Sequence, residues 1–162
     1  MKFNERYVQG VLMRWAYWDK HHEIMIPNVH FYTSSFELDM ISVTRAGLVH
    51  EYEIKISLSD YKRDFEKQCK HQLLKLGSNR YTPSYFWYAV AGFNLEAKDV
   101  PEYAGLIKII DEWPWVNVIK DAPRLHNNKI SQKQILQLAR CLSIRLSNIY
   151  HEEVKARRDA RD

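Results

Sequence analysis

Asp39, Glu53 and Lys55 lie among apolar residues in the stretch FELDMISVTRAGLVHEYEIKIS, residues 36–57. Asp39 lies in the first of its two short apolar runs, and Glu53 and Lys55 lie in the second. An unpaired charge among apolar residues is costly, so each of these charges needs a partner or a function. Two carboxylates can bind a hard cation such as Mg²⁺, and a nearby ammonium can steady a negatively charged phosphoryl group.

An antiparallel hairpin would bring the three residues together. Residues of equal parity share one face of a strand, and the Arg-Ala-Gly sequence between the runs is a turn signal in which Gly47 can adopt a positive φ. If the loop centres on Ala46, the numbers of paired residues add up to 92. This register places Asp39 directly opposite Glu53, with Lys55 two residues further along the same face.

The facing carboxylates would repel each other, at a cost of a few tenths to about 1 kcal/mol in a sheet. A divalent cation between them removes the repulsion and activates water, while Lys55 faces the substrate and is expected to act in catalysis alone. The pattern therefore favours metal-dependent cleavage of a phosphodiester. The alternative is that the charged face is solvated, as is common for antiparallel strands.

The residues ELD…HEYEIKIS, together with the Ser-x-x-Asp helix start that follows, resemble the PD-(D/E)XK nuclease superfamily. The resemblance implies that Asp39 is the first aspartate of the motif, Glu53 its second acid and Lys55 its lysine. It also implies that Ile54 lends a backbone carbonyl to the metal. The three side chains would be the catalytic residues, and the two acids would be metal ligands.

The same resemblance, which covers residues 1–95, implies a fold and a cofactor. The fold would be an α/β fold with a restriction-endonuclease-like core, in which helices flank a central mixed β-sheet in the order αβββαβ. The cofactor would be Mg²⁺ or Mn²⁺, and the substrate DNA rather than RNA, in repair, recombination or the processing of phage DNA. Leu38 occupies the position of the superfamily's proline, and either Glu5 or Glu37 would complete the metal site.

Hydrophobic periodicity predicts the elements around this site. Asn4 is expected as the N-cap of one helix, and Ser57 and Ser59 are the candidates for the cap of the helix that follows the hairpin. A single domain is expected over residues 1–162, with a frayed charged tail over 152–162. Besides the two strands of the hairpin, we expect helices at 4–19, at 58–76 and from 131 onward, and strands at 28–32, 85–93, 105–111 and 115–122.

The helix expected at 58–76 is rich in basic residues. In the superfamily that the chain resembles, the helix after the lysine strand flanks the active site. This position favours a role for Lys67, Lys70 and His71 in holding DNA phosphates. The alternative is an ordinary solvated helix face with ion pairs within the helix.

Histidines and tryptophans are the remaining candidates. His50 falls on the apolar face of its strand and is expected to be a buried, hydrogen-bonded histidine rather than a ligand. The histidine pair at 21–22 and His126 are expected in loops. Trp113 and Trp115 alternate in EWPWVNV and are expected in the core or at an interface. The alternative is that Trp113 and Trp115 stack on nucleic-acid bases.

The 162 residues carry a net charge of +4, which is compatible with a polyanionic partner. No run approaches the roughly 18 apolar residues of a membrane span, and we expect a cytoplasmic protein without a membrane partner. The sequence leaves open a homodimer or a place in a larger recombination complex. The rival of the nuclease hypothesis is a non-catalytic nucleic-acid-binding or assembly protein that retains the nuclease fold.

Overall fold

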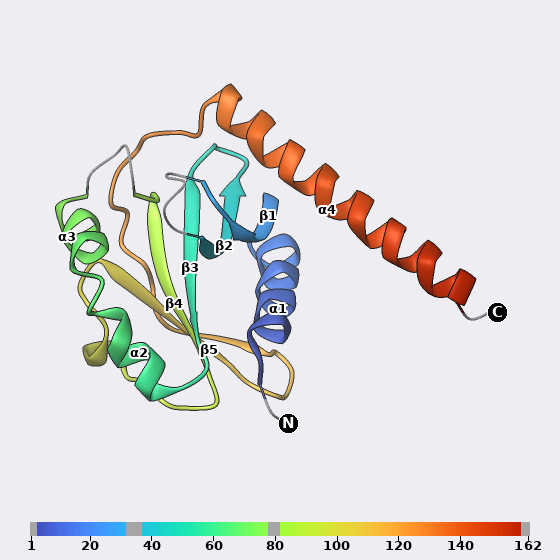
Figure 1. Cartoon of the computed structure of the whole chain (residues 1–162). Coiled ribbons are helices and arrows are strands. Elements are labelled where there is room, and N and C mark those ends of the chain that lie inside the picture. The colour runs from blue at the N-terminus through green and yellow to red at the C-terminus, as the bar shows by residue number, and fades with distance from the viewer. Residues whose placement is uncertain (1–2, 32–36, 78–81, 160–162) are drawn as a thin grey trace. The chain divides into compact units, whose positions relative to one another are not determined.

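A six-stranded mixed β-sheet forms the centre of residues 1–129 in the computed structural model of the chain (Figure 1). The structure describes residues 3–31, 37–77 and 82–159. The strands lie side by side in sequence order, and the expected α/β class is confirmed. In chain order the elements are α1 (Glu5–Trp18), β1 (His22–Val29), β2 (Leu38–Thr44), β3 (Val49–Lys55), α2 (Leu58–Asp64), α3 (Gln68–Leu76), β4 (Tyr85–Ala91), a 3-10 turn (Ala97–Asp99), β5 (Ala104–Ile109), β6 (Val116–Lys120) and α4 (Gln132–Asp159).

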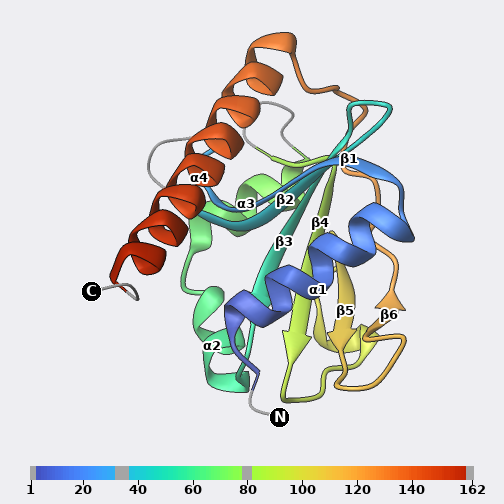
Figure 2. The ribbon, with the colours of Figure 1, turned by 90° about the vertical axis from the view of Figure 1, so that its right-hand side faces the viewer.

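Helix α1 begins where the sequence predicts. The side chain of Asn4 accepts a hydrogen bond from the Tyr7 backbone N–H at 2.8 Å and so caps the helix. Val8, Leu12 and Ala16 recur at helical spacing and are fully buried. They pack against one face of the sheet, and Figure 2 shows α1 lying across the strands of that face.

Strands β2 and β3 form the predicted hairpin in the predicted register. The pairs run from Met40 opposite Tyr52 to Val43 opposite Val49, and each pair has the expected sum of residue numbers. Gly47 adopts a φ of 82° in the turn, a conformation that glycine takes without steric cost. The hairpin therefore carries the odd-numbered residues of both strands on one face.

Strand β4 lies parallel to β3, and the connection between them places α2 and α3 on the face of the sheet opposite α1 (Figure 1). Strand β5 continues the parallel part, and β6 returns antiparallel. Each face has its own apolar core. Tyr52, Ile54 and Trp87 belong to the core beside α1, whereas Phe86 and Tyr88 belong to the core beside α2 and α3. Successive side chains along a strand thus serve opposite layers.

Two predicted elements have different limits in the structure. The first strand is β1 instead of residues 28–32, the last of which lies outside the described residues. The helix expected at 58–76 is interrupted between α2 and α3. The carbonyl of Asp64 accepts hydrogen bonds from the Lys67 N–H at 3.0 Å and from His71 Nε2 at 2.9 Å, which stabilises the break. The break changes which side chains of this segment face the sheet.

The second unit of the chain comprises residues 130–162, and its described part is largely α4. The helix continues to Asp159, whereas the charge pattern led us to expect a frayed tail from residue 152. Within that segment Arg157 donates to Glu153 one helical turn earlier, a pairing that supports the helix. Among the described helices, none combines the length and the apolar character needed to cross a bilayer.

Candidate functional site

Three charged side chains of β3 point into the layer between the sheet and helices α2 and α3. Glu51, Glu53 and Lys55 expose only between 3% and 5% of their surface. The alternative of a solvated charged face is therefore wrong. Charged and apolar residues alternate along β3 because its two faces are buried against different layers. On the face toward α2 and α3 the charges are paired with one another, which makes their burial tolerable.

Three lysine ammoniums surround Glu53. Lys55 Nζ donates to Glu53 Oε1 at 2.8 Å, and Lys67 Nζ lies 3.3 Å from the same oxygen. Lys70 Nζ contacts Oε2. Burial alone would raise the pKa of Glu53, but Lys70 and Lys55 outweigh burial and hold the pKa below its ordinary value. Glu53 is therefore a carboxylate at neutral pH.

Asp64, the last residue of α2, joins this cluster although the sequence did not reveal it. Its Oδ1 lies 2.9 Å from Lys67 Nζ and 3.4 Å from Lys55 Nζ, so both lysines bridge Asp64 to Glu53. The Tyr88 hydroxyl donates to Asp64 Oδ2 at 2.9 Å. Burial would raise the pKa of Asp64, but its contacts with His71 and Lys67 outweigh burial and lower the pKa.

Another pair in the cluster joins the buried Glu51 to the half-buried Lys70. Lys70 Nζ lies 3.0 Å from Glu51 Oε1 without hydrogen-bond geometry, and 4.9 Å from the centre of the Phe86 ring. Burial raises the pKa of Glu51, although Lys70 opposes this effect. Burial would lower the pKa of Lys70, but Glu51 and Glu53 outweigh burial and raise it. In order to hold a DNA phosphate, Lys70 would have to break its contacts with the buried carboxylates of Glu51 and Glu53.

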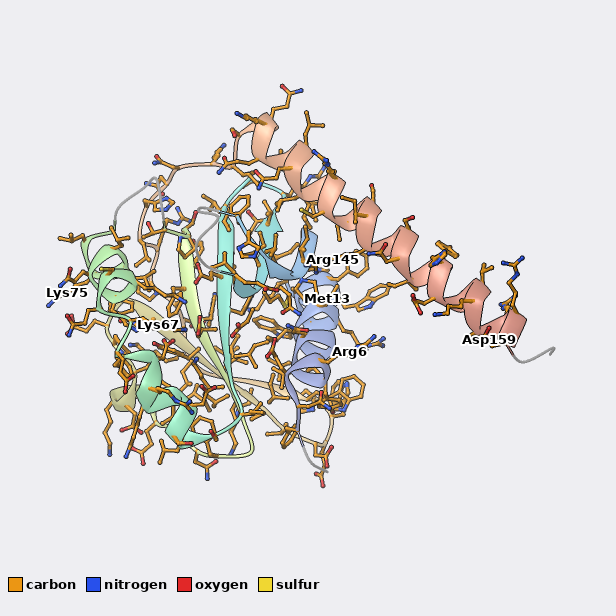
Figure 3. The ribbon with its side chains drawn as sticks, in the orientation of Figure 1. Arg6, Met13, Lys67, Lys75, Arg145 and Asp159 are labelled. Atoms are coloured by element: carbon orange, nitrogen blue, oxygen red, sulfur yellow. The ribbon has the colours of Figure 1, made fainter. Side chains whose placement is uncertain are left out.

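The other two residues predicted to hold phosphates differ in accessibility. The His71 side chain is only 12% exposed, and its Nε2 donates to the Asp64 carbonyl. Its Nδ1 accepts from the Tyr103 hydroxyl at 2.7 Å, so both ring nitrogens bind protein atoms. Lys67, labelled in Figure 3, exposes 50% of its side chain. Of the three residues, Lys67 is therefore the one best placed to meet a ligand from solvent.

Asp39 in β2 faces the same part of β3. Its Oδ2 accepts a hydrogen bond from the Ile54 backbone N–H at 2.7 Å, which fixes the carboxylate beside β3. Burial and the negative charge of Glu53 raise the pKa of Asp39 to about 7, although the Ile54 hydrogen bond opposes this. Asp39 and Glu53 are thus close enough to repel each other when both are ionised.

The two glutamates considered for completing the site are placed differently. The charge of Glu5 contributes to the raised pKa of Asp39. Gln9 links the two residues, because its Nε2 donates to Glu5 Oε1 at 2.9 Å and to the Asp39 carbonyl at 3.0 Å. The Glu37 side chain is 54% exposed and faces His30 at 4.0 Å. The geometry therefore favours Glu5.

Carboxylate and carbonyl oxygens are the ligands that a hard cation prefers. No three His, Cys, Asp or Glu side chains converge on one point in the described part of the chain. Asp39 and Glu53 would supply two carboxylate ligands, the Ile54 carbonyl is the predicted third, and water would supply the others, as Mg²⁺ or Mn²⁺ accepts. The raised pKa of Asp39 supports the fit, because a cation would relieve the repulsion that contributes to it.

His22, His50 and His126, which lie outside this cluster, contact other protein groups. The Trp87 indole N–H donates to His50 Nδ1 at 3.0 Å, so His50 is hydrogen-bonded as expected, but its side chain is half-buried and does not belong to the core. His22 was expected in a loop, but it begins β1, is 6% exposed and lies 2.7 Å from the Ser42 hydroxyl. Pairing with β2 extends the strand to this residue. His126 lies outside helices and strands, as predicted.

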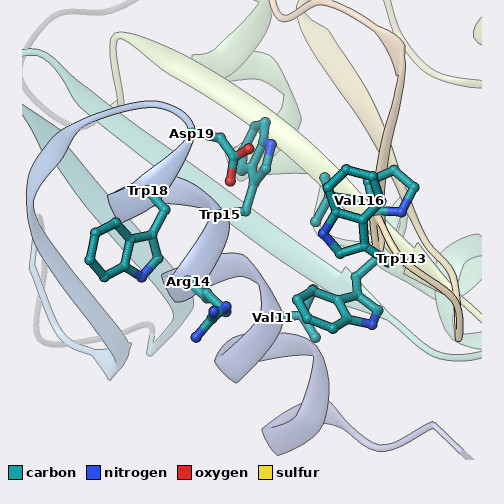
Figure 4. Close-up of a pocket in the computed structure, with 9 residues that line it drawn as sticks. Val11, Arg14, Trp15, Trp18, Asp19, Trp113 and Val116 are labelled. Atoms are coloured by element: carbon teal, nitrogen blue, oxygen red, sulfur yellow. The ribbon is translucent and has the colours of Figure 1, made fainter.

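Trp113 and Trp115 lie in the loop between β5 and β6. Trp113 is 79% exposed and Trp115 is half-buried, so the expected core position is wrong for Trp113. The loop turns back on itself through short-range backbone hydrogen bonds, which holds Trp113 outside the core. These residues line a cavity of about 260 Å³ with Trp15, Trp18 and Arg14 of α1, and Figure 4 shows Trp113 and Trp18 on different sides of it.

Base stacking by these indoles can be tested through their fluorescence. We expect single-stranded oligo(dT) to quench the wild-type protein and to bind Trp113→Ala more weakly, because stacking of one base on an aromatic ring contributes about 1 to 3 kcal/mol. Leu76→Ala is a matched control, since Leu76 is also 79% exposed but does not line the cavity. Equal affinity of the two variants for oligo(dT) would exclude base stacking by Trp113.

No model of a known protein family matches the chain, and no curated protein matches its sequence. Among solved structures, the chain is similar to the SPO1766 protein of unknown function from Silicibacter pomeroyi, with a TM-score of 0.67 and 16% sequence identity. The match covers 94% of this chain and 96% of that one. A likeness at this level of identity concerns the fold alone. The α/β arrangement of this chain is therefore similar to that of a solved protein of unknown function.

Proposed function

We propose that the protein is a metal-dependent nuclease that hydrolyses phosphodiester bonds of DNA, built on a restriction-endonuclease-like core. The observation that carries the proposal is that Asp39 accepts a hydrogen bond from the backbone N–H of Ile54, the residue between Glu53 and Lys55, which themselves form a buried ion pair. The order of elements supports it, because α1, three antiparallel strands, the α2–α3 connection and the parallel strand β4 follow the αβββαβ pattern.

Lys55 is suited to stabilising negative charge. When bound, the cation would polarise a phosphoryl oxygen and lower the pKa of a water molecule. Burial would lower the pKa of Lys55, but Glu53 and Asp64 outweigh burial and raise it, so the side chain stays an ammonium. It therefore stabilises the charge of the transition state and does not act as a general base. Because Lys55 also bridges two buried acids, it has a structural role in addition.

Asp39 and Glu53 differ in their affinity for protons. The pKa of Asp39 is raised to about 7, whereas that of Glu53 is held below its ordinary value. Two neighbouring carboxyl groups with different pKa values are typical of sites of acid–base catalysis. Before a metal binds, Asp39 can thus hold a proton near neutral pH while Glu53 stays ionised.

The rival proposal is a non-catalytic nucleic-acid-binding protein that retains the fold. The observation that favours it is the contact of Glu53 with three lysine ammoniums, which compete with a metal cation for the carboxylate. Lys67 is shared between Glu53 and Asp64 and is half exposed, so a phosphate that attracts this lysine would free part of Glu53. Binding of nucleic acid and binding of metal would then support each other.

Cleavage assays distinguish the two proposals. Supercoiled, linear, branched and single-stranded DNA would be incubated with the protein in Mg²⁺, in Mn²⁺ and in EDTA. We expect the wild type to cleave at least one form in the presence of metal, and Asp39→Asn to be slower by a factor of about 100 or more. DNA binding without cleavage under every condition would favour the rival, and the absence of both activities would contradict the two proposals together.

A further inference from the structure

A second pocket, of about 470 Å³, lies on the α1 face of the sheet, where β3 and β4 begin. Glu53 and Lys55 lie at the other end of β3 and point to the other face, so this pocket is separate from the candidate nuclease site. Its lining combines aromatic rings with two histidines, two cations and an acid. Besides Tyr52 and Tyr85, the titratable members are His22, His50, Lys20, Arg124 and Asp121.

Hydrogen bonding fixes the tautomer of His50. The Trp87 indole N–H can only donate, so His50 Nδ1, at 3.0 Å, must accept. A neutral imidazole that accepts at Nδ1 carries its proton on Nε2. Burial, followed by the charges of His22, Lys20 and Arg124, lowers the pKa of His50 to about 3, so the neutral form persists at neutral pH.

The same reasoning fixes the tautomer of His22. Tyr52 is fully buried, and its hydroxyl lies 3.0 Å from the Ser42 hydroxyl. A buried hydroxyl that fails to donate is costly, so Tyr52 donates to Ser42, and Ser42 in turn donates to His22 Nδ1 at 2.7 Å. The His22 proton therefore also resides on Nε2. Burial and the charge of Lys20 lower the pKa of His22 to about 4.

The two cations of the pocket are held by aromatic rings. Lys20 Nζ lies 5.1 Å from the centre of the Trp15 ring, and the Arg124 guanidinium lies 5.6 Å from the centre of the Tyr85 ring. Arg124 Nε also donates to the Tyr85 hydroxyl at 2.6 Å. Within the described part of the chain, neither cation forms an ion pair with an acid.

The donors of the pocket thus exceed its acceptors. The residues that line it include two histidines with their proton on Nε2, a lysine and an arginine, against the single carboxylate of Asp121. The rings of His50 and Tyr85 stack at 4.3 Å with an interplanar angle of 22°, which holds one imidazole and the ring beneath Arg124 in a fixed relation. A preorganised set of donors with an excess of positive charge matches a tetrahedral oxyanion with several acceptor oxygens.

We propose that this pocket binds a phosphate group, either of a free mononucleotide or of a nucleic-acid backbone. The two neutral imidazoles would donate to phosphate oxygens through Nε2–H, and Lys20 and Arg124 would supply the compensating charge. The proposal does not depend on nuclease activity, because none of these residues belongs to the candidate nuclease site.

Titration of the histidine-labelled protein with inorganic phosphate, followed by ¹⁵N NMR in a phosphate-free buffer at pH 7, tests the proposal. We expect saturable shifts of the Nε2 signals of His22 and His50, with a Kd on the order of 1 mM and weaker binding of acetate. Lys20→Gln and Arg124→Gln should each weaken phosphate binding by about tenfold. Both side chains are exposed, so these changes leave the core intact. Lys98→Gln, at a lysine whose side chain is 76% exposed, is the control that leaves binding unchanged.

Thymidine monophosphate and a short single-stranded oligonucleotide, used as separate probes, distinguish the source of the phosphate. Tighter binding of the mononucleotide would assign the pocket to a free nucleotide, and tighter, salt-dependent binding of the oligonucleotide would assign it to the backbone. The proposal is overturned if phosphate produces no saturable shift at about fifty times the expected Kd. It is equally overturned if acetate binds as well as phosphate, or if Lys20→Gln and Arg124→Gln respond like Lys98→Gln.

Discussion

Asp39→Asn is expected to be more stable than the wild-type protein at pH 8, by about 2 to 4 kcal/mol in the free energy of unfolding. The pKa of Asp39 rises from 3.8 to about 7 on folding, mainly through burial and the charge of Glu53. The folded state therefore binds this proton more tightly, and the free energy of unfolding falls as the pH rises from about 4 to about 7. Asparagine removes the buried negative charge and can still accept the hydrogen bond from the Ile54 N–H.

Urea denaturation between pH 4 and pH 8, with and without Mg²⁺, measures this effect. The free energy of unfolding of the wild type should fall with rising pH over that range. The variant should not show this fall, because it has no carboxyl group at position 39. Mg²⁺ at about 100 times its Kd should raise the free energy of unfolding of the wild type by about 2.7 kcal/mol, because it binds the folded state alone. The same concentration of Mg²⁺ should leave the free energy of unfolding of Asp39→Asn nearly unchanged. A variant that is less stable than the wild type at pH 8 would contradict the repulsion between Asp39 and Glu53.

Lys70→Met is expected to lower the free energy of unfolding by about 3 to 5 kcal/mol, because removal of one partner leaves a buried charge uncompensated. Lys70 Nζ lies 3.0 Å from Glu51 Oε1 and also contacts Glu53. Among the described residues, Glu51 forms an ion pair with Lys70 alone, whereas Glu53 keeps Lys55 and Lys67. The loss should appear as a lower urea midpoint at pH 7 with an unchanged slope.

Two further variants separate this effect from a general sensitivity of α3. Lys75→Met changes an exposed lysine in the last turn of the same helix and should cost no more than about 1 kcal/mol. The double variant Glu51→Gln/Lys70→Met should recover part of the loss, because both buried charges are then absent. Equal stability of Lys70→Met and Lys75→Met would show that Lys70 does not compensate Glu51.

The hairpin could be predicted in full because two independent signals fix it. The turn at Gly47 sets the loop, and the alternation of side chains sets the parity, so the pairing of Met40 with Tyr52 follows from the sequence. The start of α1 could be predicted for a similar reason, since Asn4 precedes an apolar pattern of helical period. Local chemistry determines both features, and tertiary packing does not override it.

The burial of the charged face could not be predicted in this way. A strand with alternating polar and apolar residues has the same sequence pattern whether its polar face meets water or a layer of paired charges. The positions of Glu51 and Glu53 in the sequence were therefore compatible with exposure as well as with burial. The break after α2 contains neither proline nor glycine, and it depends on the hydrogen bond between His71 and the Asp64 carbonyl. Asp64 therefore looked like a member of an exposed helix face. Its position one turn after the apolar Tyr61 was the available signal that it faces inward.

The two outer strands of the sheet have a consequence for self-association. The pairing of β1 and of β6 with their inner neighbours contains an irregular step in each case. Strand β1 also contains Pro27, which has no N–H to offer, and β6 ends at the charged Lys120. Bulges, proline and lysine at an edge all hinder the addition of a further strand. Sheet extension between molecules, the common route to strand-swapped oligomers and amyloid-like aggregates, is therefore obstructed at both edges.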